Sequence, residues 1–95
     1  MALQDQYDLS ELTNDSERLV FDELERQLSE AGPGVSRSQE CVLDMAAYAL
    51  NHVRPLYRAN LLGRIYTQAP DEERRAEVAS AVKDAIRVVT ENPPV

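Results

Sequence analysis

The sequence contains one cysteine, Cys41, and one histidine, His52. A single cysteine excludes an internal disulfide and a thiolate-cluster metal site, and a single histidine argues against a histidine-based one. Cys41 lies on an apolar helical stripe, where we expect an inert core residue. We therefore expect the protein to hold no metal and no cofactor.

Long apolar runs are also lacking, so the sequence predicts no membrane-spanning segment. The opening residues, MALQDQYDLSEL, have neither the basic region nor the apolar stretch of a secretory signal. We therefore expect a cytoplasmic protein.

The usual signatures of catalysis are missing as well. The sequence has no plausible Ser/His/Asp spacing and no glycine-rich phosphate loop, and its paired carboxylates occur on charged helix faces. Asp44 is the one acid that we expect to be partly buried, in a salt bridge or a packing role. We therefore expect a protein that is not an enzyme.

What the sequence does contain is sufficient for one small domain. Its 95 residues are 43% hydrophobic, which allows a packed core. The net charge of -7 argues against an autonomous duplex-DNA binder, because most of its surface would repel phosphate. A chain this short buries a modest core, and we expect it to gain further burial as a homodimer.

Hydrophobic periodicity predicts three long helices, hence an all-α fold of three to four helices with a short loop or strand segment. Residues 1–13 are expected to form an N-terminal arm or a short helix, and residues 14–95 the helical domain. The first long helix is expected to begin at Asn14 or Asp15, with Glu17 completing a capping box. Its apolar stripe consists of Val20, Leu24, Leu28 and Ala31, widened by Phe21.

The other boundaries follow from turn and cap chemistry. Glycine in a left-handed conformation is expected to end the first helix at Gly32-Pro33-Gly34. The second helix begins at Ser36 or Ser38, ends near Pro55 and is apolar over most of its circumference, so we expect it to be central and most buried. Residues 56–68 are expected to form an irregular loop, a short strand or a hairpin. The last helix begins at Pro70 or Asp71 and ends before Pro93.

Charge is distributed unevenly along the chain. The twenty-six residues from Met45 to Pro70 contain three arginines and no acid, hence +3, whereas the remaining residues carry seven basic and seventeen acidic side chains, hence -10. A cationic segment on an acidic protein indicates a focused anion site. Arginine suits bidentate contacts to phosphate and to guanine edges. The same residues are also compatible with solvated or ion-paired arginines, buried tyrosines and a histidine that caps backbone carbonyls.

Within this segment, the run CVLDMAAYALNHVRPLY, and especially Ala47 to Tyr57, resembles the signature of the late competence protein ComFB family. In that family a helix ending in Ala-Leu-Asn is followed by a proline, a tyrosine and a glycine. In this chain the helix is expected to end in Ala49-Leu50-Asn51, and the residues that follow in the motif are Pro55, Tyr57 and Gly63. The opening helix, LVFDELERQL, and the closing one, AVKDAIRVVTENPPV, are weaker similarities.

The resemblance implies a small helical homodimer that acts as a non-catalytic receptor for cyclic dinucleotides, chiefly cyclic di-GMP. Such receptors relay the signal to partner proteins that govern motility, pilus-linked competence or cell size. Tyr57 matches a motif position, and His52 stands where relatives carry a basic residue. Arg54, Arg58 and Arg64 are predicted from their chemistry and not from the motif. The two phosphates of the ligand need positive charge, and its two guanines need flat groups to stack on and hydrogen-bond donors. The expected ligand-binding residues are His52, Arg54, Tyr57, Arg58, Arg64, Tyr66 and Thr67.

Two departures from the family pattern bear on this expectation. Some members hold zinc with clustered cysteines, which this chain lacks. The residues between Tyr57 and Gly63, Arg-Ala-Asn-Leu-Leu, differ from the small polar residues of the second-messenger branch. This leaves the ligand open among cyclic dinucleotides. The alternative function is a structural interaction module, in which residues 51–68 dock an acidic partner and no small molecule is bound.

Overall fold

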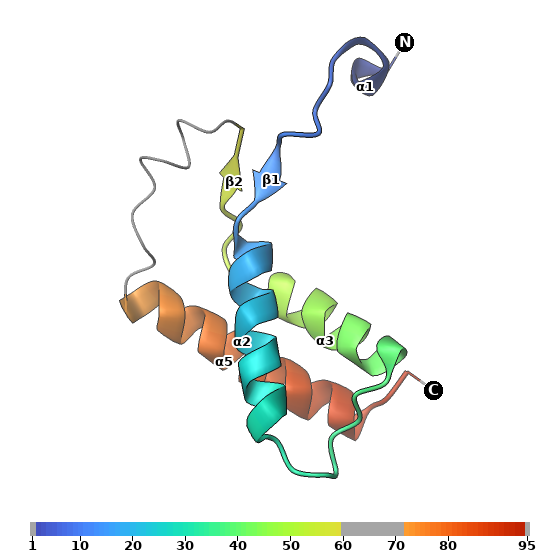
Figure 1. Ribbon diagram of the computed structural model, residues 1–95, viewed down its shortest axis with the longest axis vertical. Helices are drawn as coiled ribbons and strands as arrows, with labels where there is room; N and C mark the ends of the chain where they lie inside the picture. The colour runs from blue at the N-terminus through green and yellow to red at the C-terminus, as the bar shows by residue number, and fades with distance from the viewer. Residues whose placement is uncertain (1, 60–71, 95) are drawn as a thin grey trace.

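The protein is described by a computed structural model that covers residues 2–59 and 72–94. Its elements in chain order are α1 (Leu3–Gln6), β1 (Thr13–Asn14), α2 (Ser16–Glu30), α3 (Gln39–Leu50), β2 (Tyr57–Arg58) and α5 (Glu72–Glu91). The three long helices pack against one another, and the two short strands lie side by side next to the N-terminal end of α2 (Figure 1). The arm with α1 points away from the bundle. The predicted helical fold with a short strand segment is confirmed.

Helix α2 begins where the sequence predicts, and of its two predicted cap residues it is Asn14 whose side chain binds the first turn. Asp15 is the N-cap residue and makes no side-chain cap hydrogen bond. The Oδ1 atom of Asn14 instead accepts a hydrogen bond from the backbone N–H of Ser16 at 3.1 Å. Phe21 is 47% exposed, so its predicted place in the apolar stripe is wrong. The bundle covers only the narrow face that carries Val20 and Leu24.

The end of α2 also differs from expectation in its mechanism. The helix stops at Glu30, and Ala31 leaves it in an extended conformation. No glycine of the described chain has a positive φ, so the predicted left-handed cap is wrong. The guanidinium of Arg37 donates instead to the backbone carbonyls of Leu28 and Ala31, which satisfies acceptors that a helix end leaves free.

Helix α3 starts at the second of its two predicted caps. The Ser38 hydroxyl accepts a hydrogen bond from the backbone N–H of Cys41 at 3.2 Å. Cys41 is 4% exposed and belongs to the core, as predicted. Asp44 is exposed, so the expectation of a partly buried acid is wrong. Its position in the helix turns it away from the face that carries Met45 and Ala49.

The central helix is α5, not α3. It contributes six buried residues, whereas α3 contributes three, and it packs against both α2 and α3. Ala81 and Ala85 of α5 allow the neighbouring helices to approach closely, because they add little side-chain volume between the helix backbones. The buried hydrophobic core consists of Val20, Leu24, Cys41, Met45, Ala49, Val53, Val78, Ala81, Val82, Ala85 and Val89.

The expected strand in residues 56–68 is present at Tyr57–Arg58, and its partner is distant in sequence. Strand β2 pairs antiparallel with β1, with Thr13 opposite Arg58 and Asn14 opposite Tyr57. The rest of that segment from residue 60 onward, and the predicted start of the last helix at Pro70 or Asp71, lie outside the described residues. No helix within the described ranges is long and apolar enough to cross a membrane.

Candidate functional site

Four of the seven predicted ligand-binding residues lie in the described part of the chain: His52, Arg54, Tyr57 and Arg58. His52 and Arg54 follow α3, and Tyr57 and Arg58 form β2. The other three, Arg64, Tyr66 and Thr67, lie outside the described residues.

A cluster of directional contacts holds this segment against the N-terminal ends of α2 and α5. We call it the polar junction; it consists of Asn14, Ser16, Arg54, Arg74 and Glu77. The Ser16 side chain is fully buried and its hydroxyl donates to the Arg54 carbonyl at 2.7 Å. Arg74, 7% exposed, donates to the same hydroxyl and, at 2.6 Å, to the same carbonyl. One backbone carbonyl is thus fixed from two helices.

The polar junction also determines where β2 lies. The Oδ1 atom of Asn14 accepts from the backbone N–H of Leu56 at 2.8 Å as well as from Ser16. The carbonyl of Leu56 in turn accepts from the backbone N–H of Asp15 at 2.8 Å. These reciprocal bonds extend the two-residue ladder, which would be weak by itself.

Carboxylates from other elements reach two arginines of the acid-free segment. Arg54 Nε donates to Glu77 Oε2 at 2.9 Å, and Arg58 Nε lies 3.7 Å from Asp15 Oδ2. Glu77 also accepts from Arg74 Nη1 at 2.8 Å. A run of sequence without acids is therefore not a surface without acids, because α2 and α5 bring carboxylates to it.

His52 caps the end of α3. Its Nδ1 donates to the Tyr48 carbonyl at 2.7 Å, and its ring stacks on that of Tyr48 with centroids 4.1 Å apart. The side chain is nevertheless exposed, and the bond uses only one ring nitrogen. The other nitrogen is not engaged in that bond, and it donates to an anion only when the ring is protonated.

The Tyr57 side chain is 60% exposed. Successive residues of a strand project to opposite faces, so Tyr57 and Arg58 lie on opposite sides of the two-stranded ribbon. Arg58 turns toward Asp15, whereas the Tyr57 ring faces solvent. The structure therefore brings these neighbours to one strand, but not to one face.

The sequence analysis missed Ser16, Arg74 and Glu77. Arg74 and Glu77 are spaced three apart on one helix, which favours an ion pair between them. That spacing does not show that Arg74 is buried, nor that Ser16, 58 residues earlier, is its partner. The Asn14-x-Ser16 spacing is typical of an Asx turn and was the usable signal.

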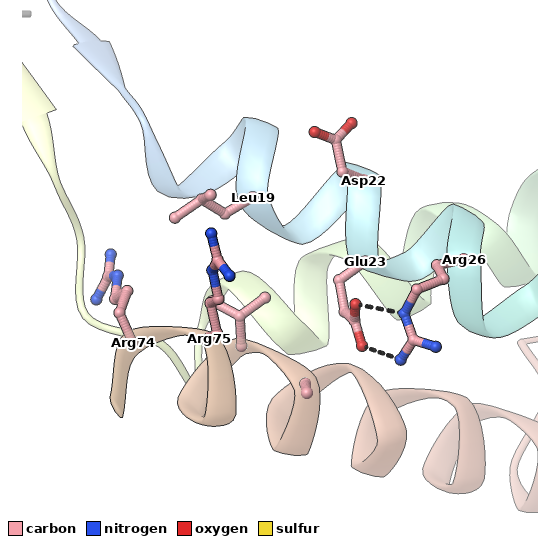
Figure 2. Close-up of a pocket in the computed structure, with 8 residues that line it drawn as sticks. Leu19, Asp22, Glu23, Arg26, Arg74 and Arg75 are labelled. Carbon is pink, nitrogen blue, oxygen red and sulfur yellow. Dashed lines mark hydrogen bonds and ion pairs between the residues drawn. The ribbon is translucent and has the colours of Figure 1, made fainter. Parts of the chain in front are cut away.

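Beside the polar junction, a groove of about 370 Å³ runs between α2 and α5 (Figure 2). Leu19, Val78 and Ala79 form its apolar part, and Arg75 extends from α5 toward α2. At its far end Arg26 donates to both carboxylate oxygens of Glu23, at 2.9 and 2.7 Å, and these bonds hold the pKa of Glu23 below its ordinary value. None of the four described candidate residues lines this groove.

Comparison with known families identifies the chain. Residues 13–93 match the family model of the late competence development protein ComFB. The chain belongs to the ComFB family. The matched range begins at the first residue of β1 and contains the polar junction, whereas the arm with α1 precedes it.

A solved ComFB structure has the same fold. It was described as "Structural characterization of the late competence protein ComFB from Bacillus subtilis", and it superimposes with a TM-score of 0.67 at 26% sequence identity. The match covers 86% of this chain and 93% of that one. No curated protein matches the chain.

Proposed function

We propose that this ComFB-family protein is a non-catalytic cytoplasmic receptor for cyclic di-GMP. In this proposal it acts as a homodimer and relays the bound state to partner proteins in motility, pilus or competence control. The candidate ligand-binding residues are His52, Arg54, Tyr57, Arg58, Arg64, Tyr66 and Thr67.

The observation that carries the proposal is the exposed Tyr57 ring in the family motif, with guanidinium groups close to it in the sequence. Tyr57 is 60% exposed on β2, so a guanine base can stack on it without displacing a core side chain. Arg54 and Arg58 precede and follow it within three residues. Guanidinium groups form strong charge-assisted bonds to phosphate and to guanine edges.

Calorimetric titration with cyclic di-GMP at fixed moderate salt tests the proposal. We expect saturable binding, weakened by about 1.5–3 kcal/mol in Arg58→Ala, the scale of a hydrogen bond to a charged group. Arg87→Ala removes the same charge from an exposed position of α5 and serves as the matched control, with unchanged affinity expected.

Absence of heat at tens of micromolar protein would overturn the proposal. The structural interaction module would then be favoured, because large apolar side chains are exposed on the arm, on α2 and α3, and on β2. A partner captured equally with and without nucleotide, and lost in Tyr57→Ala, would support that function.

A further inference from the structure

Two carboxylates form ion pairs with arginines that the proposed ligand would bind. Glu77 of α5 holds the Arg54 guanidinium at 2.9 Å, and Asp15, which precedes α2, lies 3.7 Å from that of Arg58. Both carboxylate side chains are 26% exposed, so they lie partly within the fold and are not freely solvated. An incoming phosphate competes with them for the same donors.

The ion pair between Arg54 and Glu77 can break without leaving Glu77 unpaired. Glu77 is also bound by Arg74 at 2.8 Å, and the Arg74 side chain is 9% exposed. When Arg54 departs, the carboxylate therefore keeps a buried cationic partner. The Arg54 side chain is 64% exposed, and exposed ion pairs of this kind contribute little free energy.

The Asp15 pair is looser. A separation of 3.7 Å is too long for a hydrogen bond, and Arg58 Nε makes none with the residues that the structure describes. That nitrogen is nevertheless shielded from solvent. The Arg58 side chain as a whole is 31% exposed, so a phosphate oxygen that reached its guanidinium group elsewhere would gain a charge-assisted bond that Asp15 does not form.

We infer that Glu77 and Asp15 are affinity-setting residues of the ligand site, acting as internal competitors for Arg54 and Arg58. This inference rests on the proposed function. In the free protein Glu77 holds Arg54 by a hydrogen bond and Asp15 lies beside Arg58 without one, and the ligand binds by replacing both carboxylates with its phosphates. The carboxylates remain nearby and repel a weakly held anion, so they favour a ligand that contacts several donors at once.

The test compares cyclic di-GMP affinity among Glu77→Gln, Asp15→Asn and the parent protein, by calorimetry at one salt concentration. We expect each variant to bind about three- to fivefold more tightly, as removal of an exposed ion-pair competitor predicts. The matched control is Glu73→Gln, which removes the same charge one turn earlier on α5. Glu73 is exposed and makes no ion pair within the described chain, so its variant should bind like the parent.

Glu77→Gln and Asp15→Asn differ in how much they disturb the fold. Glu77→Gln weakens a contact of buried Arg74, whereas Asp15 makes no side-chain cap bond and its change to Asn leaves a good N-cap residue. Asp15→Asn therefore decides the question if Glu77→Gln does not fold. Parent-like or weaker binding by the folded variants would overturn the inference and leave the receptor function standing. Equal tightening in Glu73→Gln would also overturn it. No binding by the parent or by any variant would overturn the receptor function, and the inference with it.

Discussion

The apolar interior and the polar junction hold the same helices together in different ways. Val20, Met45 and Val82 are fully buried and contribute through non-directional contact. The polar junction fixes the position of the Arg54 carbonyl with two donors, from Ser16 and Arg74, that lie 38 and 20 residues away. The interior thus stabilises the bundle, whereas the polar junction determines where the candidate ligand segment lies on it.

The largest effect is expected where the interior is broken. Met45→Ala removes a side chain that is 0% exposed, and we expect it to lower the free energy of unfolding by about 2–5 kcal/mol. Chemical denaturation measures this loss. Leu43→Ala is the control on the same helix, because Leu43 is 61% exposed and should cost about 0.5 kcal/mol or less. Equal losses would contradict the assigned core face of α3.

Breaking the polar junction should cost less and act more locally. Arg74→Met keeps most of the buried volume but removes the donors to Ser16 and Arg54, and we expect a loss of about 1–3 kcal/mol. Amide hydrogen exchange at Leu56 should also become faster, because the loop that carries it is held less firmly. Arg75→Met, at the adjacent exposed position, is the control. Unchanged Leu56 exchange in a destabilised Arg74→Met would show that the contact does not position the segment.

The smallest effect is expected at the exposed ion pair between Glu23 and Arg26, at the far end of the groove. Because Arg26 lowers the pKa of Glu23, the stability that this carboxylate contributes is present above its ordinary pKa of 4.5. It is lost as the pH falls through the lower pKa of the folded state. Thermal unfolding at pH 7 and pH 3 should show the parent more stable than Glu23→Gln only at the higher pH. Glu25→Gln removes the same charge from an exposed position of the same helix and is the matched control.

The helices were predictable because their signals are local. Ser38 begins α3 with a cap bond to a residue three positions away, and the apolar spacing of Val20 and Leu24 marks the buried face of α2. Phe21 and Asp44 were placed wrongly, because periodicity gives the direction of a side chain but not how much of the helix circumference its neighbours cover.

The candidate site was predictable only in part. The family motif around Tyr57 and the cationic segment are properties of a short stretch of chain, and the match over residues 13–93 agrees with the family that this motif indicated. The ion pairs of Arg54 and Arg58 are not such properties. Their partners, Glu77 and Asp15, lie on other elements.

The sequence by itself determined the helical fold, the burial of Cys41 and the family, since each depends on residues within a few positions of one another. The tertiary structure alone decided that α5 is central, that β2 pairs with β1, and that Ser16 and Arg74 converge on one carbonyl. These contacts join groups far apart in the chain. Local spacing carries no information on them, because they form only when helix packing brings the ends of α2 and α5 together.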